Sequence, residues 1–118
     1  MSVESIDYVY LETHDWTRSA AFWEGLGFRL ALNLGRAGRF EPTSGGPGIF
    51  VEEVTANQAL AFEVYLRVDG GMDADPAGTR SGTAISFEDS HWGTELARVR
   101  DPDGREFVLQ RDKDPKPG

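Results

Sequence analysis

The stretch from His91 to Gln110 constrains the fold of this chain more than any other, because it specifies a complete β-hairpin. The turn combines an Asp that bonds forward to the turn backbone, a Pro that presets φ and a Gly that tolerates positive φ: Asp101-Pro102-Asp103-Gly104. Apolar and polar residues alternate on both sides of this turn, which is typical of strands with one buried face. The hairpin therefore predicts a sheet that packs on a core with one face. The function of the other face does not follow from the hairpin alone.

Size and charge limit the class of protein. At 118 residues the chain fits a single domain, 1–118, and no apolar run approaches the roughly 20 residues of a membrane span. Twenty Asp and Glu against twelve Lys and Arg give a net charge of −8, which argues against nucleic-acid and membrane partners because both bind through basic residues. A cationic ligand would be favoured, although acidity equally serves solubility.

Two further features of the sequence bear on location and chemistry. The amino terminus lacks the basic start and apolar stretch of a secretory signal, so we expect a cytoplasmic protein. The chain has no cysteine, which removes disulfides, thiolate metal sites and cysteine nucleophiles together.

The first half of the chain has the pattern of one βαβββ module, over about residues 5–55. Its first strand alternates, with Val9 and Leu11 on one face and Tyr8, Tyr10 and Glu12 on the other. Asp15 can cap the helix that follows. The predicted elements are a helix over residues 16–24 and strands over 6–12, 28–34, 38–41 and 49–54.

The second half, over about residues 59–111, repeats part of the first. Val-Tyr-Leu at residues 9–11 recurs at 64–66, an offset of 55 (64 − 9), and Phe50-Val51 recurs as Phe107-Val108, an offset of 57 (107 − 50). Residues 70–82 are rich in Gly, Asp and Pro and predict a loop in place of a second helix. Strands are predicted over 59–68, 83–88 and the two arms of the hairpin, with a frayed tail over 112–118.

Three segments carry a resemblance to a known family: Ala21-Phe22-Trp23 running to Leu26-Gly27-Phe28, Trp92-Gly93, and the Asp101–Gly104 turn. In their order and spacing, over nearly the whole chain, the sequence resembles the vicinal oxygen chelate superfamily, and within it the glyoxalase and bleomycin-resistance group. The resemblance implies an α+β fold of two βαβββ modules that form a curled mixed sheet cup, here with the second-module helix truncated or replaced by a loop.

The resemblance also bears on metal binding. Enzymes of this superfamily hold a divalent metal on His and Glu side chains of the first and last strands of each module, positions that map here to Tyr8, Val51, Glu63 and Val108. Only Glu63 is a competent ligand among them. A shift of one residue in the fourth strand would bring in Glu52, giving two carboxylates and no histidine. We therefore expect no metal and no other cofactor.

Alternation along the strands directs aromatic side chains and one acid into the predicted cup. Such a surface suits stacking and cation–π contact with a flat aromatic or cationic molecule. The bleomycin-resistance proteins, which the chain also resembles at Leu60-Ala61-Phe62, are metal-free binders of an antibiotic between two subunits. The same tyrosines would equally fill a collapsed cup or a dimer interface, and Trp92 would equally pack over a strand end. The predicted ligand-binding residues are Tyr8, Tyr10, Phe40, Val51, Phe62, Glu63, Tyr65, Trp92 and Val108.

The function favoured by these observations is non-catalytic binding and sequestration of a small hydrophobic or cationic antibiotic-like molecule, of the drug-resistance type. A homodimer is expected, because loss of the second helix would leave a sheet face for a partner to cover. The alternative is a glyoxalase/dioxygenase-like enzyme of the same fold, either metal-free with Glu63 as acid or base, or dependent on a divalent metal. A structural dimer without a ligand is a third possibility.

Overall fold

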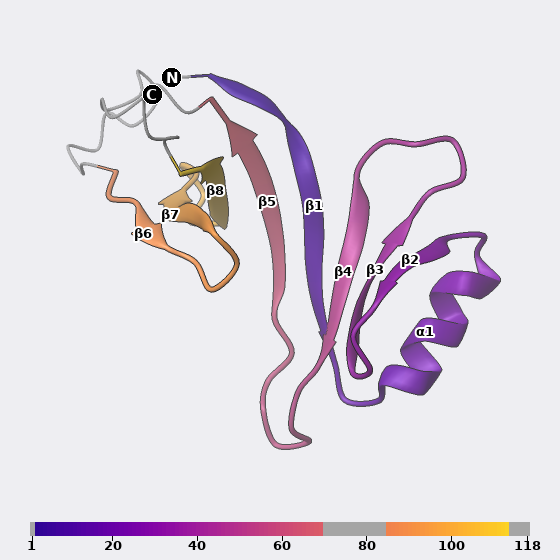
Figure 1. Cartoon of the computed structure of the whole chain (residues 1–118). Coiled ribbons are helices and arrows are strands. Elements are labelled where there is room, and N and C mark those ends of the chain that lie inside the picture. Colours follow the sequence, from indigo (N-terminus) through magenta and orange to yellow (C-terminus); the bar gives the residue numbers. More distant parts are fainter. Residues whose placement is uncertain (1, 70–84, 114–118) are drawn as a thin grey trace. The chain divides into compact units, whose positions relative to one another are not determined.

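The computed structural model describes residues 2–69 and 85–113, which fall into two compact units. One unit is Asp7–Val64, here called the helix unit; the other combines Met1–Ile6 with Tyr65–Gly118 and is called the hairpin unit. Strands β1 (Val3–Thr13) and β5 (Phe62–Val68) contribute residues to both units (Figure 1). The single-domain organisation and the module boundaries expected from the sequence stay predictions.

The helix unit has the βαβββ order predicted for the first module. After β1 come α1 (Trp16–Gly25), β2 (Arg29–Asn33), β3 (Ala37–Glu41) and β4 (Gly48–Glu53). Its strand order is β2-β3-β4-β1, with β1 parallel to β4 and β3 antiparallel to both of its neighbours. Helix α1 begins where the sequence predicted, because the Asp15 carboxylate accepts the Arg18 N–H at 3.1 Å and so caps the first turn.

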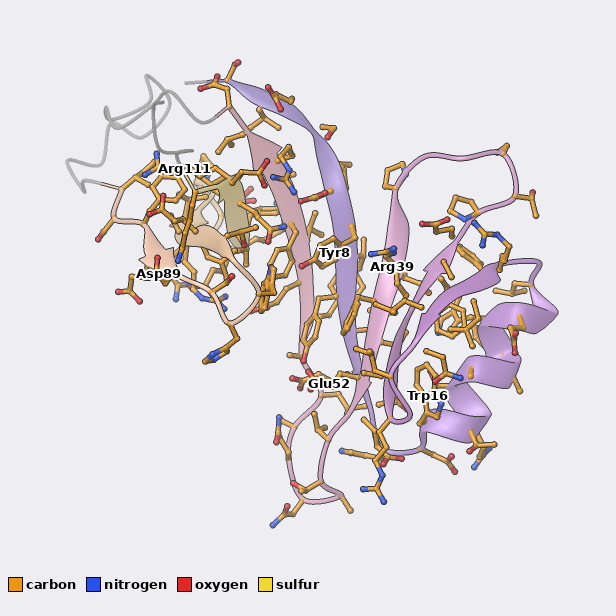
Figure 2. All side chains as sticks on the ribbon, in the orientation of Figure 1. Tyr8, Trp16, Arg39, Glu52, Asp89 and Arg111 are labelled. Carbon is orange, nitrogen blue, oxygen red and sulfur yellow. The ribbon has the colours of Figure 1, made fainter. Side chains whose placement is uncertain are left out.

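The core of the helix unit lies between α1 and the sheet. Phe40, Ile49 and Val51 are buried there, and the rings of Trp16 and Phe40 lie 5.8 Å apart. Trp16 projects from α1 toward the strands (Figure 2). Helix α1 has no fully buried residue, so it is held by this one apolar face rather than by burial all round.

Gly38 in β3 lies directly against this core. A Cβ at Gly38 would lie 2.7 Å from Cη2 of Trp16 and 2.5 Å from the Leu32 carbonyl oxygen, both far inside van der Waals contact. The absence of a side chain at this position therefore lets Trp16 pack directly against the strand.

The hairpin unit contains β6 (Glu88–Asp89), β7 (Thr94–Arg100) and β8 (Glu106–Asp112) besides β5. The order is β5-β8-β7-β6, with β5 parallel to β8 and β7 antiparallel to β8 and β6. As the alternation predicted, one face of the hairpin packs on a core, which is built from Val68, Ala97 and Leu109 with Leu66, Ile85, Phe87 and Val99 against it.

The predicted turn closes this hairpin through the Asp101 carboxylate. It accepts the N–H groups of Asp103 at 2.9 Å and Arg105 at 2.8 Å, and the Arg105 guanidinium at 2.8 Å. Desolvation alone would raise the pKa of Asp101, but these hydrogen bonds and the Arg105 charge together lower it below its usual value. The turn therefore keeps its ionised anchor at neutral pH and loses it as the pH falls through that lowered pKa.

One predicted strand is wrong in part. Residues 85–87 form no strand, and β6 consists of Glu88 and Asp89 alone, paired with Leu96 and Glu95. Ile85 and Phe87 contribute to the core as side chains without joining the ladder. The predicted loop over 70–82, the start of this strand at 83–84 and the tail from 114 onward lie outside the described residues.

The fold class is α+β, as the sequence predicted, with mixed strand pairing and a single helix in the described part of the chain. Within the same residues, no helix has the length and apolar character needed to cross a membrane.

The close approach at Gly38 yields a stability prediction. Gly38→Ala should lower the free energy of unfolding by about 1–3 kcal/mol, because the new methyl group forces Trp16 or the Leu32 carbonyl to move. Gly25→Ala is the matched control: a Cβ there meets nothing within 4 Å, and alanine is the better helix former, so its stability should be unchanged or higher. Urea unfolding of both variants measures the difference, and coincident midpoints would contradict the packing argument.

Candidate functional site

The sheet face of the helix unit opposite α1 carries aromatic and acidic side chains. In β1, Val9 packs against the core, and alternation places its neighbours on the opposite face. The parallel register sets Tyr10 level with Phe50. Two residues further along, the same register sets Glu12 level with Glu52. We call this set the aromatic face: Tyr8, Tyr10, Glu12, Phe50 and Glu52.

Tyr10 is the centre of the aromatic face. Its ring stacks on Phe50 with centroids 6.4 Å apart and planes inclined by 17°, and Tyr8 tilts against the same Phe50 ring at 6.4 Å. The Tyr10 hydroxyl lies 2.7 Å from Oε1 of Glu52 and 2.8 Å from Oε2 of Glu12. Figure 2 shows the strands that carry Tyr8 and Glu52. The face thus joins three rings to two carboxylates.

A proton count shows what this cluster favours. The Tyr10 hydroxyl carries one proton and donates it to one carboxylate at a time. The other short contact then brings two oxygen atoms together, and a second proton, from a carboxyl or from a ligand, is needed to make it attractive. The arrangement is therefore suited to an N–H donor that also carries positive charge.

The charges around the cluster point the same way. Among the described residues, neither Glu12 nor Glu52 forms an ion pair with Arg or Lys; the second oxygen of Glu12 accepts the Ala61 N–H at 2.9 Å instead. By contrast, Glu41 on the neighbouring strand is paired with both Arg29 and Arg39. The negative charge of the aromatic face is thus held by hydrogen bonds and not cancelled by a cation of this unit.

Burial raises the pKa of Tyr10 well above its usual value, and hydrogen bonds to Glu52 and Glu12 and their negative charges raise it further. The phenol is therefore a hydrogen-bond donor over the whole physiological range, because its ionised form would place a third negative charge beside two carboxylates.

The hairpin unit contains three of the predicted site residues, Tyr65, Trp92 and Val108. Tyr65 and Val108 lie level in the β5–β8 ladder, on the face opposite the core of this unit, and both are buried. Trp92 is half exposed, and its indole N–H donates to Oε1 of Gln110 at 2.7 Å. Glu63, two residues before Tyr65 on β5, belongs to the helix unit and is partly exposed.

Two predicted site residues, Phe40 and Val51, lie elsewhere than expected. Val51 was expected on the cup face, but it is buried against α1 together with Phe40, so neither side chain is on the aromatic face. The reason is register: Tyr10 pairs with Phe50 as Tyr65 pairs with Val108, so the two last strands are related by an offset of 58 (108 − 50), not 57. With this offset Val108 corresponds to Phe50 in place of Val51, and Gln110 corresponds to Glu52, so Phe50 and Glu52 lie on the aromatic face.

Phe62 differs in another way. It is strongly exposed at the start of β5, and alternation puts it on the strand face opposite Glu63 and Tyr65. The site residues that the predicted set lacked are Glu12, Phe50, Glu52 and Gln110. Alternation along the first strand already sets Glu12 on the face of Tyr8 and Tyr10. Strand pairing between distant segments reveals Phe50 and Glu52, and Glu52 was the alternative that the sequence left open; no local signal marks Gln110.

A surface hollow of about 490 Å³ also occurs in the helix unit, beside the end of β4. His14, Arg36, Glu53 and Gln58 are among its lining residues, and Nε2 of His14 lies 2.7 Å from the Gln58 carbonyl oxygen. None of the predicted ligand-binding residues lines this hollow.

A scan against protein-family models and a search of curated proteins each find no match. Solved structures do match. A glyoxalase/bleomycin resistance protein/dioxygenase superfamily member from Vibrio splendidus 12B01 aligns at 16% identity with a TM-score of 0.59, covering 89% of this chain and 97% of its own. BphC, a halotolerant catechol dioxygenase, aligns at 18% identity with a TM-score of 0.62, covering 97% of this chain and 42% of its own.

The Mn(II)-bound glyoxalase from Novosphingobium aromaticivorans aligns at 18% identity with a TM-score of 0.60, covering 93% of this chain and 39% of its own. At such identities the likeness is one of fold. The chain has the fold of the glyoxalase/bleomycin resistance protein/dioxygenase superfamily, the vicinal oxygen chelate fold that its sequence predicted.

The residues present do not fit the divalent metal site of this fold. In residues 2–69 and 85–113, no three His, Cys, Asp or Glu side chains gather as a metal site requires. On the aromatic face the two carboxylates share a tyrosine hydroxyl, and no imidazole joins them. In the hairpin unit, Val108 and Gln110 stand on the last strand where a carboxylate would be needed.

The Tyr10 cluster gives a prediction for pH. Because the folded pKa is raised, the stability that the protonated phenol contributes is complete below about pH 10, the usual tyrosine pKa, and is lost as the pH rises above it. Titration of tyrosinate absorbance should therefore give equal rises for wild type and Tyr10→Phe up to about pH 11. In urea, the absorbance rise of the wild type should exceed that of the variant by the contribution of one tyrosine. An excess already present in the folded protein would show that Tyr10 ionises normally.

Proposed function

We propose that the chain binds and sequesters, without chemistry, a small flat aromatic cation of the antibiotic-like kind. The observation that carries this proposal is the aromatic face, where two carboxylates without an Arg or Lys partner in the described residues flank a stack of three rings. The vicinal oxygen chelate fold is compatible with it. The cytoplasmic location expected from the sequence belongs to the same proposal.

The geometry suggests how such a ligand is held. Its rings lie against Tyr8 and Phe50, where each ring pair contributes about 0.5–1.5 kcal/mol. Its positive N–H groups donate to Glu12 and Glu52 and supply the second proton that the Tyr10 cluster calls for. The net charge of −8 attracts a cation from a distance and raises its local concentration. Charge thus selects the ligand class, and the rings select its shape.

Two residues that the sequence predicted as ligand contacts have another role in this proposal. Phe40 and Val51 support the aromatic face from the core instead of touching the ligand. In the hairpin unit, Trp92 offers a stacking surface of its own, while Tyr65 and Val108 stay predicted contacts. Glu63 of the helix unit also stays a predicted contact. The proposal assigns a catalytic role to no residue.

Glu52→Gln tests the role of charge. The variant keeps the shape and a hydrogen-bonding oxygen, so it should weaken binding of proflavine, a flat tricyclic cation, by about 3- to 10-fold, and leave its neutral analogue acridone unchanged. Tryptophan fluorescence quenching measures both affinities. Glu24→Gln on α1 is the control for the loss of one charge. Equal losses for both dyes, or for both variants, would refute a specific counter-ion at Glu52.

A homodimer also belongs to the proposal. In the helix unit, Phe22 of α1, Leu26 at the C-cap of α1 and Leu34 after β2 are each more than half exposed. Strand β2 is also the edge of this unit's strand order, with backbone groups available for another chain. A second copy of the chain would cover both features.

Sedimentation velocity tests the dimer. The wild type should sediment with twice the mass of the chain at micromolar concentration, and Phe22→Ser combined with Leu26→Ser should shift it to the monomer by removing apolar contact area. Leu60→Ser removes an exposed leucine elsewhere and should leave the dimer intact. A monomeric wild type would eliminate this part of the proposal.

A further inference from the structure

The segment that joins β6 to β7, Ser90–Thr94, is held by the side chain of its first residue. Oγ of Ser90 accepts the N–H groups of Trp92 and Thr94, each at 3.1 Å, and the Ser90 N–H donates to the Thr94 carbonyl at 2.8 Å. Gly93 supplies the positive φ of 92° that closes the segment. The backbone around Trp92 is thus fixed by hydrogen bonds of its own.

A chain of hydrogen bonds leads from this segment to Gln110 in β8. Oγ of Ser90 lies 3.0 Å from Oγ1 of Thr94, which donates to Oε1 of Gln110 at 2.8 Å. Because the Ser90 oxygen already accepts two N–H groups, its hydroxyl donates to the Thr94 hydroxyl. The Thr94 hydroxyl then donates to Gln110. The indole N–H of Trp92, which can only donate, is the second donor to the same acceptor atom, Oε1 of Gln110.

The burial of the two partners differs sharply. Gln110 is 2% exposed and Trp92 52% exposed. A buried amide oxygen with two donors has little freedom to move, since leaving this position would break both bonds and leave the oxygen unsatisfied away from water. The orientation of the exposed Trp92 ring is therefore fixed by its hydrogen bond to the buried Gln110 side chain. Its single polar atom is already satisfied, so what it offers a ligand is its apolar π faces.

We propose that Gln110 is a positioning residue that holds Trp92 as a preformed stacking platform for flat aromatic ligands. A platform ordered in the free protein spares the ligand the entropy of ordering it, which improves affinity for flat rings whatever their charge. Gln110 thereby sets a preference for flat rings at Trp92, in the hairpin unit alone. The platform role rests on the proposed ligand-binding function; the holding of the ring does not.

The holding of the ring can be measured without a ligand. In protein labelled with ¹⁵N at indole nitrogen, the Trp92 signal is assigned by its loss in Trp92→Phe. Exchange of its N–H with solvent should be at least about tenfold faster in Gln110→Met, which keeps the volume and loses the acceptor. Gln110→Glu retains an acceptor oxygen and should restore slow exchange. Ser90→Ala, at the other end of this series of hydrogen bonds, should also speed exchange. It replaces Gln110→Met as the test variant if Gln110→Met does not fold.

Ligand binding is then compared for the same variants. Gln110→Met should weaken proflavine and acridone by the same factor, several-fold, unlike Glu52→Gln, which acts on the cation alone. Unchanged exchange in Gln110→Met and Ser90→Ala overturns the positioning role. Faster exchange with unchanged affinity for both dyes overturns the platform role. A wild type that binds neither dye contradicts the proposed function itself, and the exchange rates then still decide whether Gln110 holds the ring.

Discussion

The parallel pairing of β1 with β4 is the constraint on which the helix unit depends. It sets Val9 level with Ile49 toward α1, and Glu12 level with Glu52 on the other face. A slip of one residue would exchange the two faces of β4 and bury Glu52 under the helix, at a cost of several kcal/mol for an unpaired charge. The register that builds the core is therefore also the register that builds the aromatic face, and neither varies without the other.

Local features of this structure were readable in the sequence. The Asp101–Gly104 turn, the Asp15 cap and the alternation of β1 each depend on residues a few positions apart, whose chemistry dictates the backbone nearby. The fold class followed from their order. What was not readable is the pairing of distant strands: Ile49, Phe50 and Val51 are all apolar, so nothing local decides which of them faces α1.

The candidate site shows the same limit more clearly. The sequence placed Tyr8 and Tyr10 on the correct face but put Val51 there instead of Glu52. Its predicted cup therefore held Glu63 as the single acid and lacked the two carboxylates, Glu12 and Glu52, that contact the Tyr10 hydroxyl. Gln110 was read as an ordinary polar residue of an alternating strand, since its role comes from Trp92 and Thr94 arriving from another strand. Two aromatic side chains are thus held in two ways, Tyr10 by charged acceptors and Trp92 by a neutral buried amide. Salt and pH act on the first and not on the second.

The closure of the hairpin by Asp101 also bears on how the chain folds. Arg100 and Glu106, the first pair of the β7–β8 ladder, are six residues apart (106 − 100), whereas Tyr8 and Gly48 in the β1–β4 ladder are 40 apart (48 − 8). Closing the longer loop costs about 1–2 kcal/mol more chain entropy. Since Asp101 ties the short loop without help from the rest of the chain, we expect β7 and β8 to pair early and the crossover of the helix unit to limit the folding rate.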